Sequence, residues 1–331
     1  MTINTFIEVC AGAGGLSSGF MKAGWNPLLL NDINKDCCET LKLNHKDVNV
    51  ECCSIDEIDL NKYIGKVDLL MGGVPCQSFS HAGLRKGLND ERGQLVFKFI
   101  NMIKTIRPKM FLIENVKGLL THDEGKTLKK VLDELNKIKT YTIQYKVLNS
   151  MNYDVPQKRE RLFIVGLKKK KGVSFEYPEK LDRIPVIKDV LVDVPESPCS
   201  KYSDEKKELF KQIPQGGCWI NLPEETQKSY LGKSYNSGGG KRGMLHRLDM
   251  NKPCLTLLCT PTQKQTERCH PLEERPLTVR EYARIQTFDD NYIFTGSTSS
   301  QYKQIGNAVP VNLAKHLGSS FLKTLEQYKK K

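Results

Sequence analysis

The chain has 331 residues, 39% of them hydrophobic, which is enough for a substantial core and for two domains. No segment approaches the roughly 18 consecutive apolar residues of a membrane span, and no signal-peptide pattern opens the sequence. These features predict a cytoplasmic protein without a membrane segment. The formal net charge of +13 favours polyanionic partners, with an affinity that falls as the salt concentration rises.

The first half of the chain alternates strand-like and helix-like segments. Short apolar runs predict strands, and the segments between them predict helices. Because strands that alternate with helices form parallel sheets covered on both faces, the sequence predicts an α/β fold with a doubly wound, mostly parallel sheet. The expected strands are residues 5–10, 27–30, 67–71, 110–114, 141–148 and 162–167, and the expected helices are residues 14–23, 34–43, 94–105 and 127–138.

The character of the sequence changes near residue 172, and Pro, Ser, Lys and Gly are frequent from residue 178 to residue 243. The run at 238–243 (GGGKRG) fits neither a helix nor a central strand. This part of the chain is therefore expected to form a smaller, loop-rich domain. Helical signals return at 277–288, and Pro310 is expected to open a final helix.

The eleven cysteines give no metal-binding pattern, since no Cys-x-x-Cys pair occurs. Cys37 and Cys38 are adjacent in sequence, as are Cys52 and Cys53, which is a poor geometry for chelation or bridging. We therefore expect no metal and mostly reduced thiols.

A glycine-rich turn at residues 11–15 (AGAGG) joins the first expected strand to the first expected helix. Glycines there let the backbone approach a ligand, and the helix N-terminus offers free N–H groups. Asp32 ends the second strand, where nucleoside-binding α/β folds place an acid on the ribose hydroxyls. The two features predict a nucleoside-containing cofactor, and the alternative is a turn acid with a capping role.

Two further strand ends carry reactive side chains. Cys76 follows the run 67–71 in the loop GGVPCQSFS, where either a nucleophile or a small buried hydrophobic residue would fit. Glu114 ends the strand at 110–114, either as an acid of the site or as a helix cap. Because parallel strands end at one rim of a sheet, the turn, the cysteine and the glutamate are expected to converge.

Taken in order, these segments resemble the cytosine-C5 DNA methyltransferases of bacterial restriction–modification systems, over most of the chain. The matching blocks are residues 8–15 (EVCAGAGG), 73–78 (GVPCQS), 114–116 (ENV), 157–161 (QKRER), 275–281 (RPLTVRE) and 304–310 (QIGNAVP). The resemblance implies transfer of a methyl group from S-adenosylmethionine to C5 of cytosine in DNA. It also implies a Rossmann-like catalytic domain at 1–183 plus 306–331, a target-recognition domain at 184–275 and a hinge at 276–305.

The resemblance assigns the catalytic steps to a few residues. Cys76 would attack C6 of a cytosine flipped out of the duplex, and Glu114 would bond to or protonate N3. Arg161 would bind O2 of the base, with Arg159 nearby and Gln77 beside the nucleophile. The S-adenosylmethionine site would comprise Cys10, Ala11, Gly12, Gly14, Gly15, Leu16, Asp32, Ile33, Ser54, Ile55, Gly73, Pro75, Leu95, Asn307 and Ala308.

By the same resemblance, residues from about 184 to 272 would read the DNA sequence. The glycines Gly83, Gly87 and Gly93 suit hinges, so we hypothesise that the loop 78–93 closes over the flipped base. The expected DNA contacts are Ser80, Arg85, Lys86, Arg92, Lys241, Arg242, Arg247, Thr256, Leu257, Lys264 and Arg268. For any single basic residue, a plain phosphate contact or solvent exposure is the simpler interpretation. We expect a monomer acting on double-stranded DNA, which a cognate restriction endonuclease could accompany.

Three alternatives stay open at this point. A tRNA cytosine methyltransferase of the related eukaryotic type would use the same chemistry, but its Cys-Phe-Thr element is missing. A catalytically inactive DNA-binding relative is disfavoured by the presence of both Cys76 and Glu114. A nicotinamide dehydrogenase is disfavoured because the glycine spacing differs from Gly-x-Gly-x-x-Gly.

Overall fold

The computed structural model describes residues 4–74, 91–236 and 243–330, and only the backbone of 91–94. The chain forms two compact units. The first unit comprises Met1–Asn149, Glu160–Lys180 and Val311–Lys331, and the second comprises Ser150–Arg159 and Leu181–Pro310. The expected limits of the catalytic, target-recognition and hinge segments stay a prediction.

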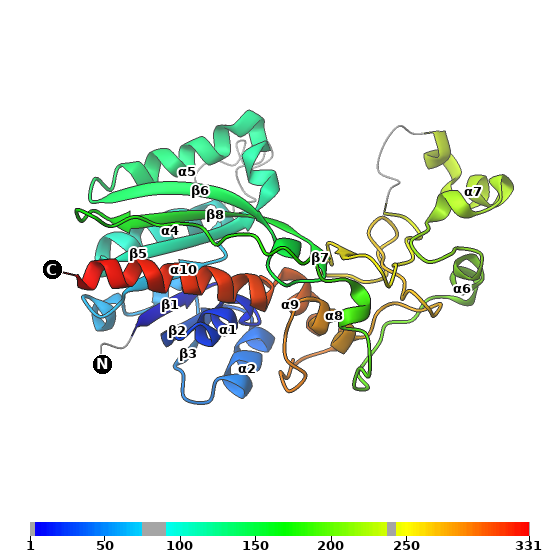
Figure 1. The fold of residues 1–331 in the computed structure, drawn as a ribbon, viewed down its shortest axis with the longest axis horizontal. Helices are drawn as coiled ribbons and strands as arrows, with labels where there is room; N and C mark the ends of the chain where they lie inside the picture. Colours follow the sequence, from blue (N-terminus) through cyan, green and yellow to red (C-terminus); the bar gives the residue numbers. More distant parts are fainter. Residues whose placement is uncertain (1–3, 75–90, 237–242, 331) are drawn as a thin grey trace. The chain divides into compact units, whose positions relative to one another are not determined.

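The first unit is built on a seven-stranded sheet in the order β3–β2–β1–β4–β5–β8–β6 (Figure 1). β8 is antiparallel to both of its neighbours, and the other neighbouring pairs are parallel. The expected mostly parallel sheet is thus confirmed. The strands are β1 Thr5–Val9, β2 Asn26–Asp32, β3 Val50–Cys52, β4 Leu69–Gly72, β5 Met110–Val116, β6 Tyr141–Asn149 and β8 Glu160–Lys168.

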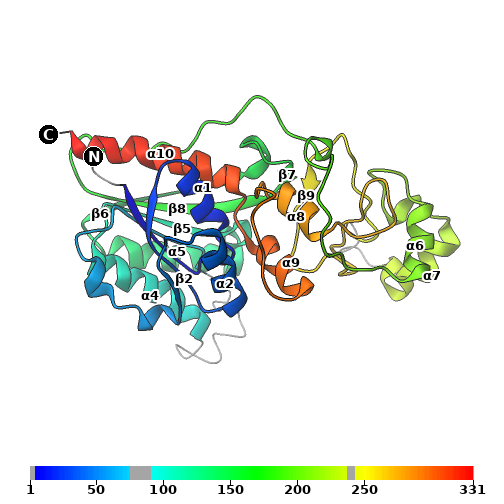
Figure 2. The same cartoon turned by 90° about the horizontal axis from the view of Figure 1, so that it is seen from below.

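Helices cover both faces of this sheet, as the doubly wound arrangement requires. Figure 2 shows α1 and α10 on one face, and α4 and α5 on the other. Within the described residues of the unit, the helices are α1 Gly15–Lys22, α2 Lys35–Asn44, α4 Glu91–Ile106, α5 Lys126–Asn136 and α10 Val311–Lys329. Short 3-10 turns lie at Ile55–Glu57, Leu60–Tyr63, Lys117–Leu120 and His122–Gly125.

The helices α1 and α10 pack closely against each other, although most of the chain separates them in sequence. A Cβ at Gly19 would lie 2.3 Å from Cβ of Ala314, so only glycine lets the two helices approach this closely. Trp25 donates an indole N–H to the carbonyl of Gly318 at 2.9 Å. The final helix therefore completes the core on its face of the sheet.

The opposite face is covered by apolar stripes at helical spacing. α4 buries Val96, Phe99 and Ile103, and α5 buries Leu128, Val131 and Leu135. These side chains form one cluster with residues of β1, β4 and β5. This packing fixes the strands whose carboxyl ends carry the candidate site.

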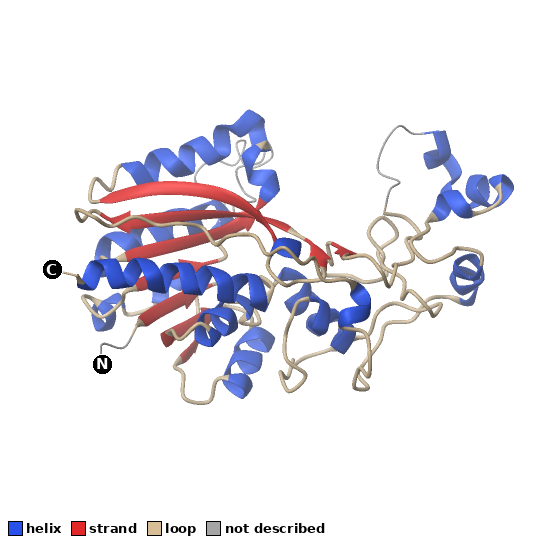
Figure 3. Ribbon diagram, in the orientation of Figure 1, coloured by secondary structure: helices blue, strands red, loops and turns tan. Residues whose placement is uncertain are grey.

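The second unit contains short elements joined by long irregular segments (Figure 3). Its core gathers Tyr202, Phe210, Ile213, Leu222, Leu245 and Cys269. The strands are β7 Gln157–Lys158 and β9 Cys254–Leu255, and the helices are α6 Asp204–Lys211, α7 Glu224–Leu231, α8 Val279–Ile285 and α9 Thr298–Asn307. The remaining 3-10 turns are Ser150–Asn152, Ile187–Asp189, Trp219–Asn221 and Gly232–Asn236. No helix in the described part of the chain combines the length and apolar character that crossing a membrane requires.

Candidate active site

The glycine turn after β1 is fastened to the end of β2 by Asp32. Its carboxylate accepts hydrogen bonds from the backbone N–H of Gly12 and of Asn34, each at 2.8 Å. Gly12 and Gly14 have φ of 56° and 76°, a backbone region that favours glycine. Asp32 thus has the capping role of a turn acid, and each oxygen keeps further acceptor capacity for a ligand hydroxyl.

The other expected cofactor residues of the first unit lie around the ends of the same strands. Cys10 has a left-handed backbone with φ of 53°, and burial, followed by the charges of Asp32 and Glu8, raises the pKa of its thiol to about 12. Ile33 is 74% exposed, an unusual position for an isoleucine. Ala11, Gly14, Gly15, Leu16 and Ile55 are buried, and Gly12, Ser54, Gly73 and Leu95 are half-buried.

Glu8, on β1, is a buried acid that the sequence did not single out. Burial is the main cause that raises the pKa of its carboxyl to about 8, with smaller contributions from Asp32 and Glu114. Hydrogen bonds from Ser17 oppose the shift. The carboxyl therefore carries a proton at neutral pH, and its Oε2 has no partner in the described structure.

We expect Glu8→Gln to flatten the dependence of stability on pH. The folded pKa lies above the unfolded value of 4.5, so the native state retains a proton that the unfolded chain releases between pH 4.5 and 8. Wild-type stability should fall by about 3 to 5 kcal/mol as the pH rises through this window, and the variant should lose that component. Urea unfolding at pH 5, 7 and 9 measures it, with the exposed Glu179→Gln as control. Equal slopes for the wild type and Glu8→Gln would contradict the assignment.

Glu114 and Arg161 form an ion pair at the carboxyl end of β5. Nε of Arg161 lies 3.0 Å from Oε1 of Glu114, and the two side chains are only 13% and 12% exposed. The antiparallel register sets this geometry, because Arg161 on β8 lies opposite Val116 on β5. A Cβ built on Gly73 would be 3.3 Å from Oε2 of Glu114, so the carboxylate also lies close to the chain after β4.

Asn115 fastens the start of the expected nucleophile loop to this pair. Its Nδ2 donates to the carbonyl of Val74 at 2.8 Å, and both residues are buried. Pro75, Cys76 and Gln77 lie outside the described residues, as do Ser80, Arg85 and Lys86. The last described residue before the loop is therefore held next to Glu114.

A buried polar network in the second unit holds two of the expected functional segments. The guanidinium of Arg159, with no exposed surface, donates to the carbonyl oxygens of Leu257 at 3.0 Å and of Gly306 at 2.8 Å. Gln157 accepts from the N–H of Leu257 and donates to Gln286. Gln286 in turn donates to the carbonyls of Ile305 and Ala308. Arg159 is thus a positioning residue for the segments at 256–257 and 306–308.

Local contacts explain the shape of those two segments. A Cβ on Gly306 would lie 2.7 Å from the carbonyl carbon and oxygen of Leu258, so a side chain there would collide with backbone. Asn307 is exposed, and its Oδ1 accepts from the thiol of Cys259 at 3.0 Å. Thr256 donates its hydroxyl to the carbonyl of Lys158 at 2.7 Å.

The expected DNA contacts of the second unit fall into different environments. Arg247 is 5% exposed and donates to Phe210, Pro271 and Glu274, so its guanidinium is committed to contacts within the unit. Arg268 is also buried, at 7% exposure. Lys264 is exposed, with its ammonium 4.3 Å from the ring centroid of Tyr230. Lys241 and Arg242 lie outside the described residues, and the side chain of Arg92 is not described.

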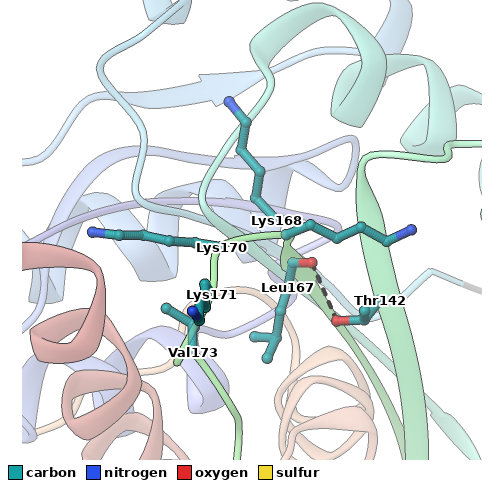
Figure 4. Close-up of a pocket in the computed structure, with 7 residues that line it drawn as sticks. Thr142, Leu167, Lys168, Lys170, Lys171 and Val173 are labelled. Atoms are coloured by element: carbon teal, nitrogen blue, oxygen red, sulfur yellow. Dashed lines mark hydrogen bonds between the residues drawn. The ribbon is translucent and has the colours of Figure 1, made fainter.

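Among the described residues, no three or more His, Cys, Asp or Glu side chains come together in a group that could hold a metal ion. A surface hollow lined by Lys168, Lys170 and Lys171 lies beside the end of β8 (Figure 4). It belongs to the strand end opposite to Glu114 and Arg161, because Leu167 pairs with Met110 at the start of β5. The hollow is therefore separate from the candidate site.

Comparison with known proteins identifies the family of this chain. A sequence model of the family described as C-5 cytosine-specific DNA methylase matches residues 4–323. The chain is 46% identical to the type II methyltransferase M.Eco47II of Escherichia coli, over 99% of the chain and 81% of that protein. It is 48% identical to the type II methyltransferase M.Sau96I of Staphylococcus aureus, over 97% of the chain and 76% of that protein.

A solved structure has a similar fold. It is that of a DNA modification methyltransferase encoded within an E. coli prophage, with a TM-score of 0.71 and 24% sequence identity. The match covers 97% of this chain and 99% of that one.

The fold is that of a methyltransferase. The chain belongs to the C-5 cytosine-specific DNA methylase family. It therefore acts on DNA and transfers a methyl group to C5 of cytosine, which confirms the class of enzyme that the sequence predicted.

Proposed function

We propose that S-adenosylmethionine is the methyl donor and that it binds at the carboxyl ends of β1, β2 and β4. Two features of the chain fit such a ligand. The turn at Gly12 and Gly14 has open left-handed backbone, and Asp32 presents a carboxylate beside the exposed Ile33. The donor would supply an electrophilic methyl group. The remaining residues of the first unit proposed to hold it are Cys10, Ala11, Gly15, Leu16, Ser54, Ile55, Gly73, Pro75 and Leu95. The cofactor role expected of Asn307 and Ala308 stays a prediction.

The residues of the chain would activate the cytosine by a covalent route. The thiolate of Cys76 attacks C6 of a flipped-out base, which makes C5 nucleophilic. Glu114 hydrogen-bonds N3 and stabilises the charge that the attack creates, while Arg161 binds O2 and orients Glu114. Loss of the proton from the methylated C5 then releases Cys76 and restores the aromatic ring.

The observation that supports this proposal is the half-buried ion pair of Glu114 and Arg161 beside Asn115. The pair presents a carboxylate and a guanidinium for one base edge. Asn115 holds Val74, two residues before Cys76, to the same strand. An acid held next to the start of a nucleophile loop is what attack at C6 requires.

We also propose a biological setting, supported by the names of the relatives. M.Eco47II and M.Sau96I are type II methyltransferases, so the chain would be the modification enzyme of a type II restriction–modification system. It would act as a monomer on double-stranded DNA in the cytoplasm, alongside a cognate endonuclease. The exposed Lys264 and the expected donors outside the described residues would contact the DNA.

Methyl transfer from labelled S-adenosylmethionine tests the proposal directly. The wild type should label duplex DNA and not tRNA, and Cys76→Ala should abolish labelling. DNA containing 5-fluorocytosine should form a covalent adduct with the wild type alone, because fluorine blocks release of the thiol. Labelling by Cys76→Ala, or preferential labelling of tRNA, would contradict it. Sequencing DNA from expressing cells for 5-methylcytosine would then give the target site.

A further inference from the structure

Two cysteines from different elements meet beside the proposed cofactor acid. Cys38 lies on α2 with no exposed surface, and Cys52 is the exposed last residue of β3. Cys52 is the register partner of Asp32 across the parallel β2–β3 pair. The fold thus brings together one cysteine from the pair Cys37–Cys38 and one from the pair Cys52–Cys53. Their separation in sequence gives no indication of this proximity.

Both thiols donate to backbone carbonyls at the end of β2. The side chains of Cys38 and Cys52 also lie close enough for each to influence the other's ionisation. Sγ of Cys38 lies 3.2 Å from the carbonyl oxygen of Asp32, and Sγ of Cys52 lies 3.9 Å from that of Ile33. The carboxylate of Asp32 meanwhile holds the glycine turn through Gly12. The dithiol therefore supports the backbone on which the turn depends.

We propose that Cys38 and Cys52 form a reversible dithiol–disulfide site that controls binding of the methyl donor. The part of this inference that concerns the donor rests on the role proposed for Asp32. A disulfide carries no S–H donor, so oxidation removes the thiol bonds to the carbonyls of Asp32 and Ile33. The backbone at 32–33 then shifts, and the ribose acid with it.

The oxidant is a small disulfide, such as oxidised glutathione, and the exchange balances. Cys52, the accessible thiol, loses its proton and attacks the small disulfide, giving a mixed disulfide and one small thiol. Cys38 then loses its proton and attacks the sulfur of Cys52, which expels the second small thiol. Two electrons pass from the protein sulfurs to the small disulfide, and a dithiol reductant reverses both steps.

The surroundings affect the two steps differently. Burial is the main cause that raises the pKa of the Cys38 thiol, and the neighbouring Cys52 adds to it. The raised pKa slows the second attack. The ammonium of Lys42 lies near both thiols, although it also pairs with Glu39 at 2.9 Å. Oxidation is therefore expected to be slow in a reducing cytoplasm and to proceed under sustained oxidising conditions.

The test treats the full-length protein with oxidised glutathione and maps disulfides by peptide mass spectrometry. Binding of S-adenosylhomocysteine is measured by calorimetry before treatment, after it, and after reduction with dithiothreitol. We expect a Cys38–Cys52 link and at least about a fivefold loss of affinity (about 1 kcal/mol), restored by reduction. Cys52→Ser and Cys38→Ser should keep their affinity under oxidation, whereas the matched neighbour Cys53→Ser should respond like the wild type.

Each other outcome overturns a stated part of the proposal. Absence of the Cys38–Cys52 link, or an equal loss of affinity in Cys52→Ser, would overturn the dithiol site. A link that leaves affinity unchanged would overturn its control of binding. Failure of the reduced wild type to bind S-adenosylhomocysteine would instead count against the proposed function, and the peptide map would still decide whether the link forms.

Discussion

Replacement of Glu114 by Gln is expected to lower kcat by about 100-fold to 10,000-fold, the range over which a positioned acid accelerates proton transfer. The amide keeps the shape of the side chain and can still contact Arg161, but it cannot donate an acidic proton to N3 of the base. Binding of S-adenosylhomocysteine should be unchanged, because the substitution leaves the proposed donor site intact. Steady-state labelling of duplex DNA measures kcat, and calorimetry measures binding.

Glu160→Gln is the matched control for this substitution. Glu160 pairs with Lys117 at 2.8 Å, but the two side chains are 43% and 54% exposed. A surface pair of this kind contributes little to stability, and its carboxylate has no part in the proposed chemistry. A kcat for Glu114→Gln as high as that for Glu160→Gln would remove Glu114 from its proposed role.

The second large effect is expected in the other unit. Arg159→Ala should destabilise the packing of the 254–259 and 304–308 segments by about 3 to 5 kcal/mol, since two buried carbonyls lose their charged donor and a cavity remains. Hydrogen exchange of the Cys254, Leu257 and Ala308 amides should accelerate at least about 100-fold, as tenfold corresponds to 1.4 kcal/mol. Mass spectrometry of the corresponding peptides measures this.

Two further variants test whether the planar guanidinium of Arg159, and not a positive charge alone, is needed at this position. Arg159→Lys should rescue little, because one ammonium group does not reproduce the planar fork that reaches both Leu257 and Gly306. Lys158→Ala, an exposed neighbour on β7, should leave exchange unchanged. If the three amides are as well protected from exchange in Arg159→Ala as in Lys158→Ala, then Arg159 does not hold these segments.

The residues at the carboxyl ends of the strands could be predicted because the strand ends follow from the local sequence. Apolar runs ended by glycine or acid placed Asp32 and Glu114 at the ends of strands, and β2 ends at Asp32 as expected. The strand β5 runs two residues further, through Val116, because it pairs with β8 over its whole length. The two interpretations of Asp32 are also compatible, since one carboxylate both fastens the turn and remains accessible.

Residues whose roles depend on distant partners could not be assigned in this way. Arg247 carries a charge in a basic stretch, which favours a DNA contact, but its partners Phe210 and Glu274 lie 37 and 27 residues away in the sequence. Arg159 reaches carbonyls 98 and 147 residues away. The raised pKa of Glu8 and the hydrogen bonds of Gln286 likewise depend on burial. No local sequence pattern around these residues indicates that burial.

Some elements were missed although part of their signal was present. β3 has only three residues, too few for an apolar pattern to stand out. The helix α6 lies in the polar stretch that is expected to be loop-rich. Ser203 caps it by accepting from the N–H of Lys206, and Asp204 and Glu205 occupy its first turn. A serine followed by two acids is a recognisable helix start, even where the helix itself is short.

The contact of α10 with α1 has a consequence for the order in which the enzyme is made. α10 leaves the ribosome only after the whole second unit has been translated, and until then Phe20 and Trp25 lack the helix that buries them. The nascent first unit thus exposes an aromatic patch throughout synthesis of the second. The core of the first unit is therefore complete only once residues 311–329 have been translated.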